Sequence, residues 1–384
     1  MNNKKIRVIA FYLPQFHPIP ENDKWWGKGF TEWTNVGKAK PLFKGHYQPR
    51  VPADLGYYDL RLSEVREAQA ELAREAGIEG FCYWHYWFNS KKQLLERPFN
   101  EVLSSGNPDF PFCLGWANHS WTNKSWEVGT KKVKEQTLME MVYDKEEYIK
   151  HFYDVLPAFK DRRYIKVDGK PLFLVFRPLE IPNPHEFIDL WQRLAKENGL
   201  SGVYFVGIQY NMKPSEWNWK NIIMKNAPDK SVELYQQVLD AGYDAVNSRG
   251  YNRADYYSRS VWDTLWRSFA MRILKYTPIS KCNQKIINKY LYVEEDKWEN
   301  VFPSLLPNWD RSARSGRKAR IYTNSTPEVF KDQLSTVIDL LKDKEDEHKI
   351  TFLMSWNEWA EGNYVEPDLK YGHGYLEALK EMIK

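Results

Sequence analysis

The feature that most constrains the fold is an alternation of short apolar segments with longer amphipathic ones along the 384 residues. This order is typical of repeated βα units with parallel strands, and it argues against a β-sandwich or a helix bundle. The first unit has a strand over 6–12 and a helix over 60–76, which Gly77 ends. Further strands are predicted over 80–87, 112–116, 172–176, 203–208, 244–247, 301–306 and 350–356, with helices over 93–104, 144–160, 184–198 and 328–342.

Eight strands that alternate with helices favour an α/β fold of the (β/α)8 TIM barrel type. A doubly wound sheet is less compatible, because neither a GxGxxG turn nor a P-loop is present. The strand over 301–306 is the weakest of the eight, since Pro303 and Pro307 cannot donate backbone hydrogen bonds. Because no linker, repeat or low-complexity segment divides the sequence, we expect residues 1–384 to form a single domain.

Two segments depart from the simple repeat. The first βα connection is long and rich in aromatic residues, which argues for a functional loop and against disorder. The second, 253–297, mixes aromatic residues with Lys and Arg and is predicted to be a helical insertion after strand six. This insertion could dock an acidic glycan, a membrane surface or a partner protein such as a member of a biosynthetic complex. Alternatively, it is a solvated helix whose indoles reach the barrel.

Charge and motifs exclude several classes of function. A net charge of +4 creates no strong field for nucleic acid, so nucleic acid is not expected as a partner. The three cysteines lack CxxC spacing, and no HExxH motif or Asp-rich loop is present. Although His85 and His119 could reach one centre, we predict neither a metal nor a cofactor. The polar N-terminus resembles no signal peptide and no apolar run reaches 18 residues, which predicts a cytoplasmic protein.

The candidate catalytic residues follow the last predicted strand. Glu358 and Glu361 lie in the sequence SWNEWAEG, between and beside tryptophans. In a (β/α) barrel the active site lies at the carboxyl ends of the strands, which is where this segment begins. Two carboxylates are the minimum for general acid and base work on a glycosidic bond, and an adjacent indole can raise the pKa of one of them by excluding water. The competing interpretation is that Glu358 and Glu361 lie in a solvated turn and have no catalytic role.

Other strand ends carry groups suited to sugars, which present hydroxyls beside apolar C–H faces. Aromatic residues make up 16% of the chain, more than a core alone usually demands. Side chains alternate along a strand, so about half of these rings should pack against helices, and Trp84 and Trp87 should differ in role. For His17 a structural hydrogen bond is as plausible as a substrate contact. The predicted substrate-binding residues are Tyr12, His17, Trp26, Glu32, Trp33, Tyr83, His85, Tyr86, Trp116, Asn118, Trp309, Asp310, Trp356 and Asn357.

Several of these motifs occur together in one family. FYLPQFH at 11–17, WWG at 25–27, GFTEW at 29–33, HYQP at 46–49, YWHYW at 83–87 and WNEWAEG at 356–362 resemble the WbsX-type glycosyltransferases, also described as glycoside hydrolase family 99-like. The resemblance spans nearly the whole chain and implies a (β/α)8 barrel. By kinship with family 99 endo-α-mannosidases, it also implies a retaining mechanism. Glu358 would then be the base on the 2-hydroxyl, giving a 1,2-anhydro sugar, and Glu361 the acid/base at the leaving oxygen.

Three functional hypotheses follow. The first is an enzyme that makes or breaks glycosidic bonds of a bacterial surface polysaccharide, of the O-antigen, lipopolysaccharide or capsule type with which the family is associated. The second is a glycosyltransferase that uses a nucleotide- or lipid-linked sugar donor, although no nucleotide-sugar motif is present. The third is a non-catalytic glycan-binding barrel. All three take an oligosaccharide or polysaccharide as ligand, but the sugar, the linkage, exo or endo action and the oligomeric state stay open.

Overall fold

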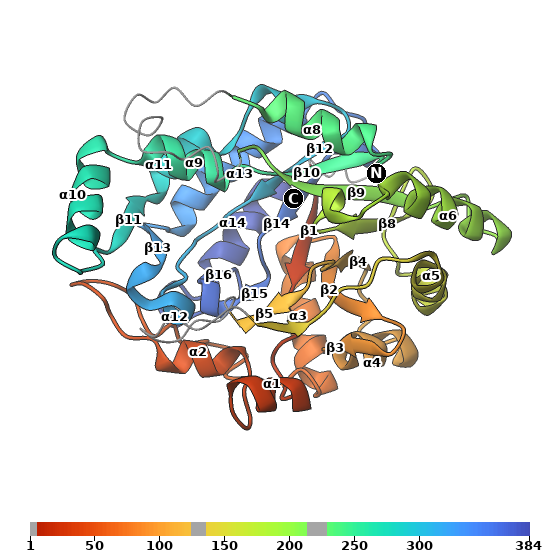
Figure 1. Cartoon of the computed structure of the whole chain (residues 1–384), viewed down its shortest axis with the longest axis horizontal. Coiled ribbons are helices and arrows are strands. Elements are labelled where there is room, and N and C mark those ends of the chain that lie inside the picture. Colours follow the sequence, from red (N-terminus) through yellow and green to blue (C-terminus); the bar gives the residue numbers. More distant parts are fainter. Residues whose placement is uncertain (1–5, 124–135, 213–228) are drawn as a thin grey trace.

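The computed structural model describes residues 6–123, 136–212 and 229–384, and at its centre eight parallel strands close into a barrel surrounded by helices (Figure 1). The first strand pairs with both the second and the last, which closes the barrel. The predicted (β/α)8 fold is therefore confirmed. The barrel strands are β1 (Arg7–Tyr12), β2 (Gly80–Asn89), β4 (Phe112–Trp116), β8 (Lys170–Val175), β9 (Tyr204–Tyr210), β10 (Ala245–Arg249), β12 (Val301–Leu305) and β14 (Ile350–Leu353).

Helices cover the outside of the barrel, as the amphipathic segments predict. Helix α3 ends at Gly77, whose φ of 87° is the left-handed conformation that glycine adopts most readily. The main outer helices are α3 (Ser63–Ala76), α4 (Arg97–Ser105), α5 (Lys145–Phe159), α6 (Pro184–Glu197), α8 (Ser231–Asp240), α11 (Gln284–Leu291), α13 (Pro327–Leu341) and α14 (Gly374–Ile383).

Strand β12 confirms the weakest of the predicted strands. Ser304 and Leu305 are in register with β14, and Ser248 of β10 lies opposite Pro303. The hydroxyl of Thr351 donates to the carbonyl of Pro303 at 2.8 Å. Propensity alone predicts a loop here, but neighbours on both sides of the strand outweigh the missing donor.

The helix predicted over 93–104 begins later than expected. Residues of β3 (Lys92–Leu94) instead form a hairpin with the end of β2, where Tyr86 pairs with Leu94. The antiparallel pairing with β2 supplies hydrogen bonds to the backbone of β3, and side-chain periodicity along the segment does not reveal this pairing. Helix α4 then starts at Arg97, with Pro98 in its first turn.

The two unusual segments are both more ordered than a loop. The first connection contains α1 (Pro20–Trp26) and α2 (Glu32–Lys38). The insertion after β10 contains α9 (Tyr251–Ser258) and α10 (Val261–Arg272), as predicted, but also strand β11 (Ser280–Asn283). The sequence does not predict β11, because its partner β13 (Arg320–Thr323) comes from the next connection. Helix α10 lies at the left margin of the molecule in Figure 1.

Connections at the carboxyl ends of the strands also contain α12 (Ser312–Ser315) and two short antiparallel strand pairs. These pairs join β5 (Trp121–Thr122) to β6 (Thr137–Met139), and β15 (Asn357–Glu358) to β16 (Asn363–Tyr364). At the opposite end, β7 (Lys166–Val167) pairs with β8. Among the described residues, no helix is both long enough and apolar enough to cross a bilayer.

Candidate active site

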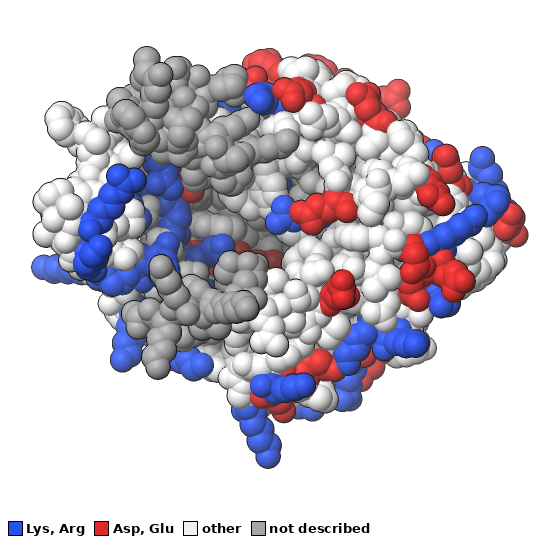
Figure 2. Space-filling model, in the orientation of Figure 1, with Lys and Arg blue, Asp and Glu red and all other residues white. Residues whose placement is uncertain are grey.

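A cleft opens at the carboxyl end of the barrel, where the two candidate catalytic residues lie. Its volume is about 460 Å³, and the space-filling view is hollowed near its middle, with basic and acidic side chains visible inside (Figure 2). Its described lining combines flat rings, four arginines and two carboxylates, a mixture suited to a polar ligand with apolar faces. These residues are Trp84, Tyr86, Trp121, Phe176, Tyr210, Tyr251, Trp309, Arg177, Arg249, Arg311, Arg314, Glu358 and Glu361.

Glu358 is positioned by the hairpin that follows the last barrel strand. The indole of Trp84, on β2, donates from Nε1 to Oε1 of Glu358 at 3.3 Å. Burial raises the pKa of Glu358 to about 7, and the nearby charge of Glu361 acts in the same direction. Glu358 is therefore a carboxyl group that can hold a proton near neutral pH.

Glu361 has the opposite electrostatic environment. Burial alone would raise its pKa, but Arg311 and Arg314 lower it below the ordinary value of a glutamate. Nη1 of Arg314 lies 2.5 Å from Oε1 of Glu361, and Nε of Arg311 lies 3.3 Å from the same oxygen. The two carboxyl groups of the pair are thus driven toward different protonation states, which is the arrangement expected of an acid and its ionised partner.

Glu32 extends this network across the seam between the first and last strands. Arg314 donates to Oε1 of Glu32 at 2.8 Å, and the backbone N–H of Ala360 donates to the same oxygen at 3.0 Å. Burial raises the pKa of Glu32, although Arg314 opposes that shift. Glu32 therefore holds Arg314 in place from outside the cleft.

Arg249 is the most unusual charge in the cleft. Its side chain is 4% exposed, and its guanidinium lies over the rings of Phe11, Trp84 and Phe176 at 4.9 to 5.7 Å. Among the described residues, no carboxylate lies within ion-pair distance of it, and its Nε and Nη2 atoms have no hydrogen-bond partner. The charge of Arg249 acts on Glu358 without forming an ion pair. A buried cation without a paired carboxylate is costly, so this position favours an anionic ligand.

Strand alternation divides the predicted site residues into two groups. Tyr86, Trp309, Glu358 and Glu361 line the cleft. Another five lie between the barrel and its helices: Tyr12, Tyr83, His85, Trp116 and Trp356.

Contacts of the outward group show what these side chains touch. The hydroxyl of Tyr12 donates to Gln69 on α3 at 2.6 Å. The rings of His85 and His151 join at 3.0 Å through their Nε2 atoms, and Trp116 packs against Phe187 on α6. As alternation predicts, Trp84 faces the cleft and Trp87 stacks on His151.

Five more predicted residues lie in or beside the loops around the cleft without lining it. Asn357 joins the backbone of Leu13 through its Oδ1 and Nδ2 atoms. Asn118 makes the corresponding pair of bonds to the backbone of Arg177. The indole of Trp33 donates to the carbonyl of Tyr58 at 2.8 Å. His17 is 2% exposed and lies near Asp59, while Trp26, half-buried at the end of α1, contacts Phe30.

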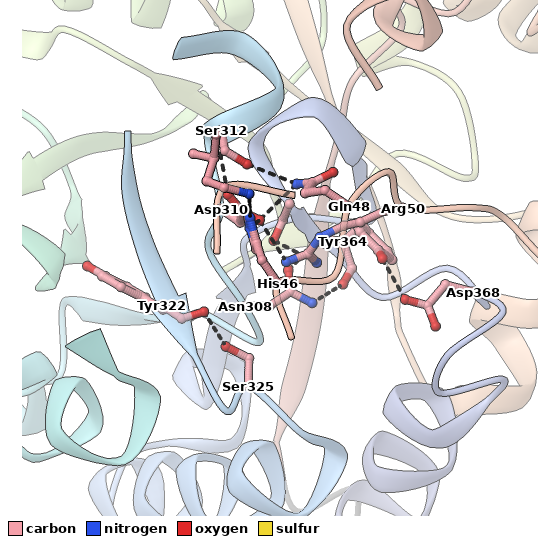
Figure 3. Close-up of polar contacts among 12 residues, drawn as sticks. His46, Gln48, Arg50, Asn308, Asp310, Ser312, Tyr322, Ser325, Tyr364 and Asp368 are labelled. Carbon is pink, nitrogen blue, oxygen red and sulfur yellow. Dashed lines mark hydrogen bonds and ion pairs between the residues drawn. The ribbon is translucent and has the colours of Figure 1, made fainter. Parts of the chain in front are cut away.

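Asp310 organises a buried polar network behind the cleft. Figure 3 shows His46, Gln48 and Arg50 converging on its carboxylate, with distances of 2.8 Å to both His46 and Gln48 and 3.7 Å to Arg50. Hydrogen bonds from His46 and the charge of Arg50 hold the pKa of Asp310 far below its ordinary value, although burial opposes this. Asp310 thus ties the first connection to the last strands.

A second cavity, of about 520 Å³, is separated from the cleft by the segment that contains Asp310. Trp309 and Arg311 line the cleft, whereas Asp310 between them lines the second cavity. Lys44, Lys281 and Lys370 also border that cavity.

The aromatic and arginine residues of the cleft that sequence reasoning missed are Trp84, Trp121, Phe176, Tyr210, Tyr251, Arg177, Arg249, Arg311 and Arg314. For Trp84 a signal existed, because it alternates with Tyr86 on the same strand. For the arginines there was none, since Arg311 and Arg314 come from a connection whose path depends on the barrel being closed.

Histidines do not converge in the cleft. His119 lines it, but His85 lies on the outer side of β2. Among the described residues, one group of three could meet at a cation: Glu299, Glu345 and His348. It lies at the amino end of the strands, away from the cleft, where His348 already bridges Glu299 and Asp168.

Comparison with known families agrees with this fold. Residues 8–379 match the family described as glycosyltransferase WbsX. The chain belongs to the WbsX glycosyltransferase family. Two relatives, each an uncharacterized protein WxcX from Xanthomonas campestris pv. campestris (strains B100 and ATCC 33913), are 34% identical over 377 residues. The match covers 98% of this chain but 49% of each relative, so the WbsX chain spans about half the length of these relatives.

Solved structures show the same barrel. A glycoside hydrolase-like protein aligns with a TM-score of 0.58 at 15% identity, covering 100% of this WbsX chain and 95% of its own. The GH99 endo-alpha-mannosidase from Bacteroides thetaiotaomicron, in complex with bis-tris-propane, aligns with a TM-score of 0.54 at 13% identity, covering 98% and 96%. At these identities the similarity concerns the fold.

Proposed function

We propose that this WbsX protein makes or breaks a glycosidic bond, with Glu358 and Glu361 as the catalytic pair. The observation that carries the proposal is the divergence of the two carboxyl groups: burial raises the pKa of Glu358 to about 7, while Arg311 and Arg314 lower the pKa of Glu361. Rings on two sides of the cleft, such as Trp84 and Trp309, are suited to the C–H faces of a sugar.

The different pKa shifts of Glu358 and Glu361 also favour different catalytic roles for the two residues. Glu358, with a pKa near 7, is the better proton donor to a leaving oxygen, and Glu361 is the better base or nucleophile. This is the reverse of the roles implied by the resemblance to family 99. We propose Glu358 as the acid because a carboxylate paired with Arg314 resists protonation.

We further propose that the substrate is a bacterial surface polysaccharide or its lipid-linked precursor. The family resemblance supports this substrate class. An α-mannoside is the first candidate sugar, because the GH99 endo-alpha-mannosidase has the same fold.

Glutamine variants of the pair test both the activity and the roles. A panel of α-linked oligosaccharides, α-mannosides included, is incubated with the protein and read by mass spectrometry, and aryl glycosides are then built on the sugar that is cleaved. Both Glu358→Gln and Glu361→Gln should abolish turnover of the oligosaccharide. If Glu358 is the acid, only Glu358→Gln should recover on an aryl glycoside, whose leaving group needs no proton.

A surface carboxylate, Glu381→Gln, is the matched control and should behave as the parent. Retained activity in Glu361→Gln would overturn the catalytic pair. Recovery of Glu361→Gln alone on the aryl glycoside would restore the roles that the family resemblance implies.

A second candidate function is transfer from a phosphate-linked sugar donor, and Arg249 favours it. A diphosphate leaving group would supply the hydrogen-bonded anion that this buried guanidinium does not find among the described residues. Isothermal titration with nucleotide-linked and lipid-linked sugars tests this function, with neutral oligosaccharides as the comparison. Binding of a donor that is lost in Arg249→Gln supports transfer, and binding of neutral glycans alone supports hydrolysis.

A non-catalytic glycan-binding barrel is the remaining hypothesis. It predicts glycan affinity without a product across both substrate panels. The opposed environments of Glu358 and Glu361 count against it, because a binding site has no need to hold two carboxyl groups in different protonation states.

A further inference from the structure

Helix α10 carries an apolar stripe that faces solvent. Its residues lie at the spacing i, i+3, i+4 and i+7 that ordinarily marks the buried face of a helix. Here Trp262 is 79% exposed, Leu265 44%, Trp266 51% and Phe269 49%. Past the end of the helix, Ile273 continues the same face at 66% exposure. The indoles therefore do not reach the barrel, which removes one of the interpretations left open for this insertion.

The opposite side of helix α10 contacts the rest of the protein, so the apolar stripe is exposed on a helix that is fixed in place. Ala270 is fully buried, and Arg267 donates to the carbonyl of Pro278 at 2.6 Å. Downstream, β11 pairs with β13 over four residues. The exposed apolar face is therefore presented outward by contacts with the body of the protein.

Positive charge is concentrated around this face. The 31 residues from 259 to 289 contain seven Lys and Arg residues but a single acidic residue, Asp263, which gives the segment a net charge of +6. The whole chain has a net charge of only +4. In Figure 2 the margin where α10 lies shows Lys and Arg beside uncharged surface. The basic residues are Arg259, Arg267, Arg272, Lys275, Lys281, Lys285 and Lys289.

We propose that the exposed face of α10, formed by Trp262, Leu265, Trp266, Phe269 and Ile273, docks on a bilayer that contains anionic phospholipids. Indole and phenyl rings with aliphatic side chains insert at the level of the headgroups, and nearby Lys and Arg attract acidic lipids. The five stripe residues offer no hydroxyl or amide side chain. An interface with another protein usually contains several hydrogen bonds across it, whereas docking on a lipid surface does not require them. This inference is independent of the catalytic proposal.

Vesicle sedimentation tests the inference with the full chain. The protein is mixed with vesicles of phosphatidylcholine alone and of phosphatidylcholine with one quarter phosphatidylglycerol. We expect the bound fraction to be larger with the anionic vesicles and to fall with added salt. The double variant W262S/W266S should lower the partition coefficient on anionic vesicles at least tenfold, because two inserted indoles are lost.

Charge reversal provides a second readout. The variant R272E/K275E should lower binding to anionic vesicles about tenfold or more while leaving the weak binding to neutral vesicles unchanged. Its matched control, K160E/K196E, reverses two exposed lysines on other helices and should bind as the parent. Likewise, L369S removes an exposed leucine, 69% accessible, away from α10 and should have no effect.

Two outcomes would overturn the inference. The first is equal sedimentation of the parent and of W262S/W266S with anionic vesicles, with circular dichroism showing that both are folded. The second is a dimer in lipid-free buffer, seen by analytical ultracentrifugation, that W262S/W266S dissociates. That result would make a second copy of this chain the occupant of the α10 face.

Discussion

Arg314 holds Glu361 by a contact of 2.5 Å between Nη1 and Oε1, and its other terminal nitrogen holds Glu32 at 2.8 Å. One guanidinium thus links the connection after β1 with the segment after β14. Because β1 and β14 are neighbours only in the closed barrel, this bridge exists only once the barrel has formed. Together with Arg311, it also lowers the pKa of Glu361 in the candidate catalytic pair.

Removing the guanidinium of Arg314 should impair the catalytic role of Glu361. In Arg314→Met we expect kcat/KM to fall about 100-fold, because Glu361 loses one of the two arginine charges that keep it ionised. The acid limb of the pH profile should move to higher pH, since the pKa of Glu361 rises when the cation is removed. Arg193→Met, on an exposed helix position, is the control. An unchanged acid limb would show that Arg314 does not set the ionisation of Glu361.

The activity should also depend on the proton of Glu358. Its pKa is raised to about 7, so the group is protonated below that pH and loses its proton as the pH rises through it. As a proton donor, it should make kcat/KM fall on the alkaline side of about pH 7. The pH profile on an aryl glycoside should lose this limb, because such a leaving group needs no acid. A rise in activity above pH 7 would identify Glu358 as a base.

Two tyrosines on one strand test which face of β2 meets the substrate. Tyr86 lines the cleft, whereas Tyr83 packs against Tyr12 and Phe99 outside the barrel. Tyr86→Phe should lower kcat/KM about tenfold, the usual cost of one lost hydrogen bond to a ligand. Tyr83→Phe keeps the ring and should leave turnover unchanged. Equal losses in the two variants would contradict the assignment of faces.

Asp310 should matter mainly for stability. Asp310→Asn removes the charge that pairs with Arg50 and accepts from His46, leaving the buried Arg50 guanidinium without this counter-charge. We expect the free energy of unfolding to fall by about 3 to 5 kcal/mol, measured by urea denaturation. Asp332→Asn, on the outer helix α13, should change it by less than about 0.5 kcal/mol. A native-like midpoint in Asp310→Asn would show that the network of Figure 3 contributes little.

Much of the barrel could be predicted from residue order. The strands over 6–12, 80–87 and 112–116 lie within two residues of the bounds of β1, β2 and β4, because buried parallel strands are continuous apolar runs. The hairpin of β3 and the pairing of β11 with β13 could not be predicted, since each depends on a partner chosen by tertiary contacts.

The candidate site likewise contains residues that the sequence could predict and residues that it could not. Glu358 and Glu361 are recognisable from the motif around them, and the period of two along β2 would have separated Trp84 from His85. Nothing in the sequence near Arg249 indicates that it ends up in an aromatic pocket, without an ion-pair partner among the described residues. Its surroundings come from β1, β2 and the end of β8, which are distant in the chain.

The sequence by itself determined the repeated βα order, the pair of glutamates at the last strand and the aromatic, basic composition of 253–297. Only the tertiary structure decided which glutamate holds a proton, because Arg311 and Arg314 approach one carboxylate and burial acts on the other. It also decided that the stripe of α10 faces solvent. Helical periodicity shows that a face is apolar, but what covers that face depends on where the rest of the chain has packed.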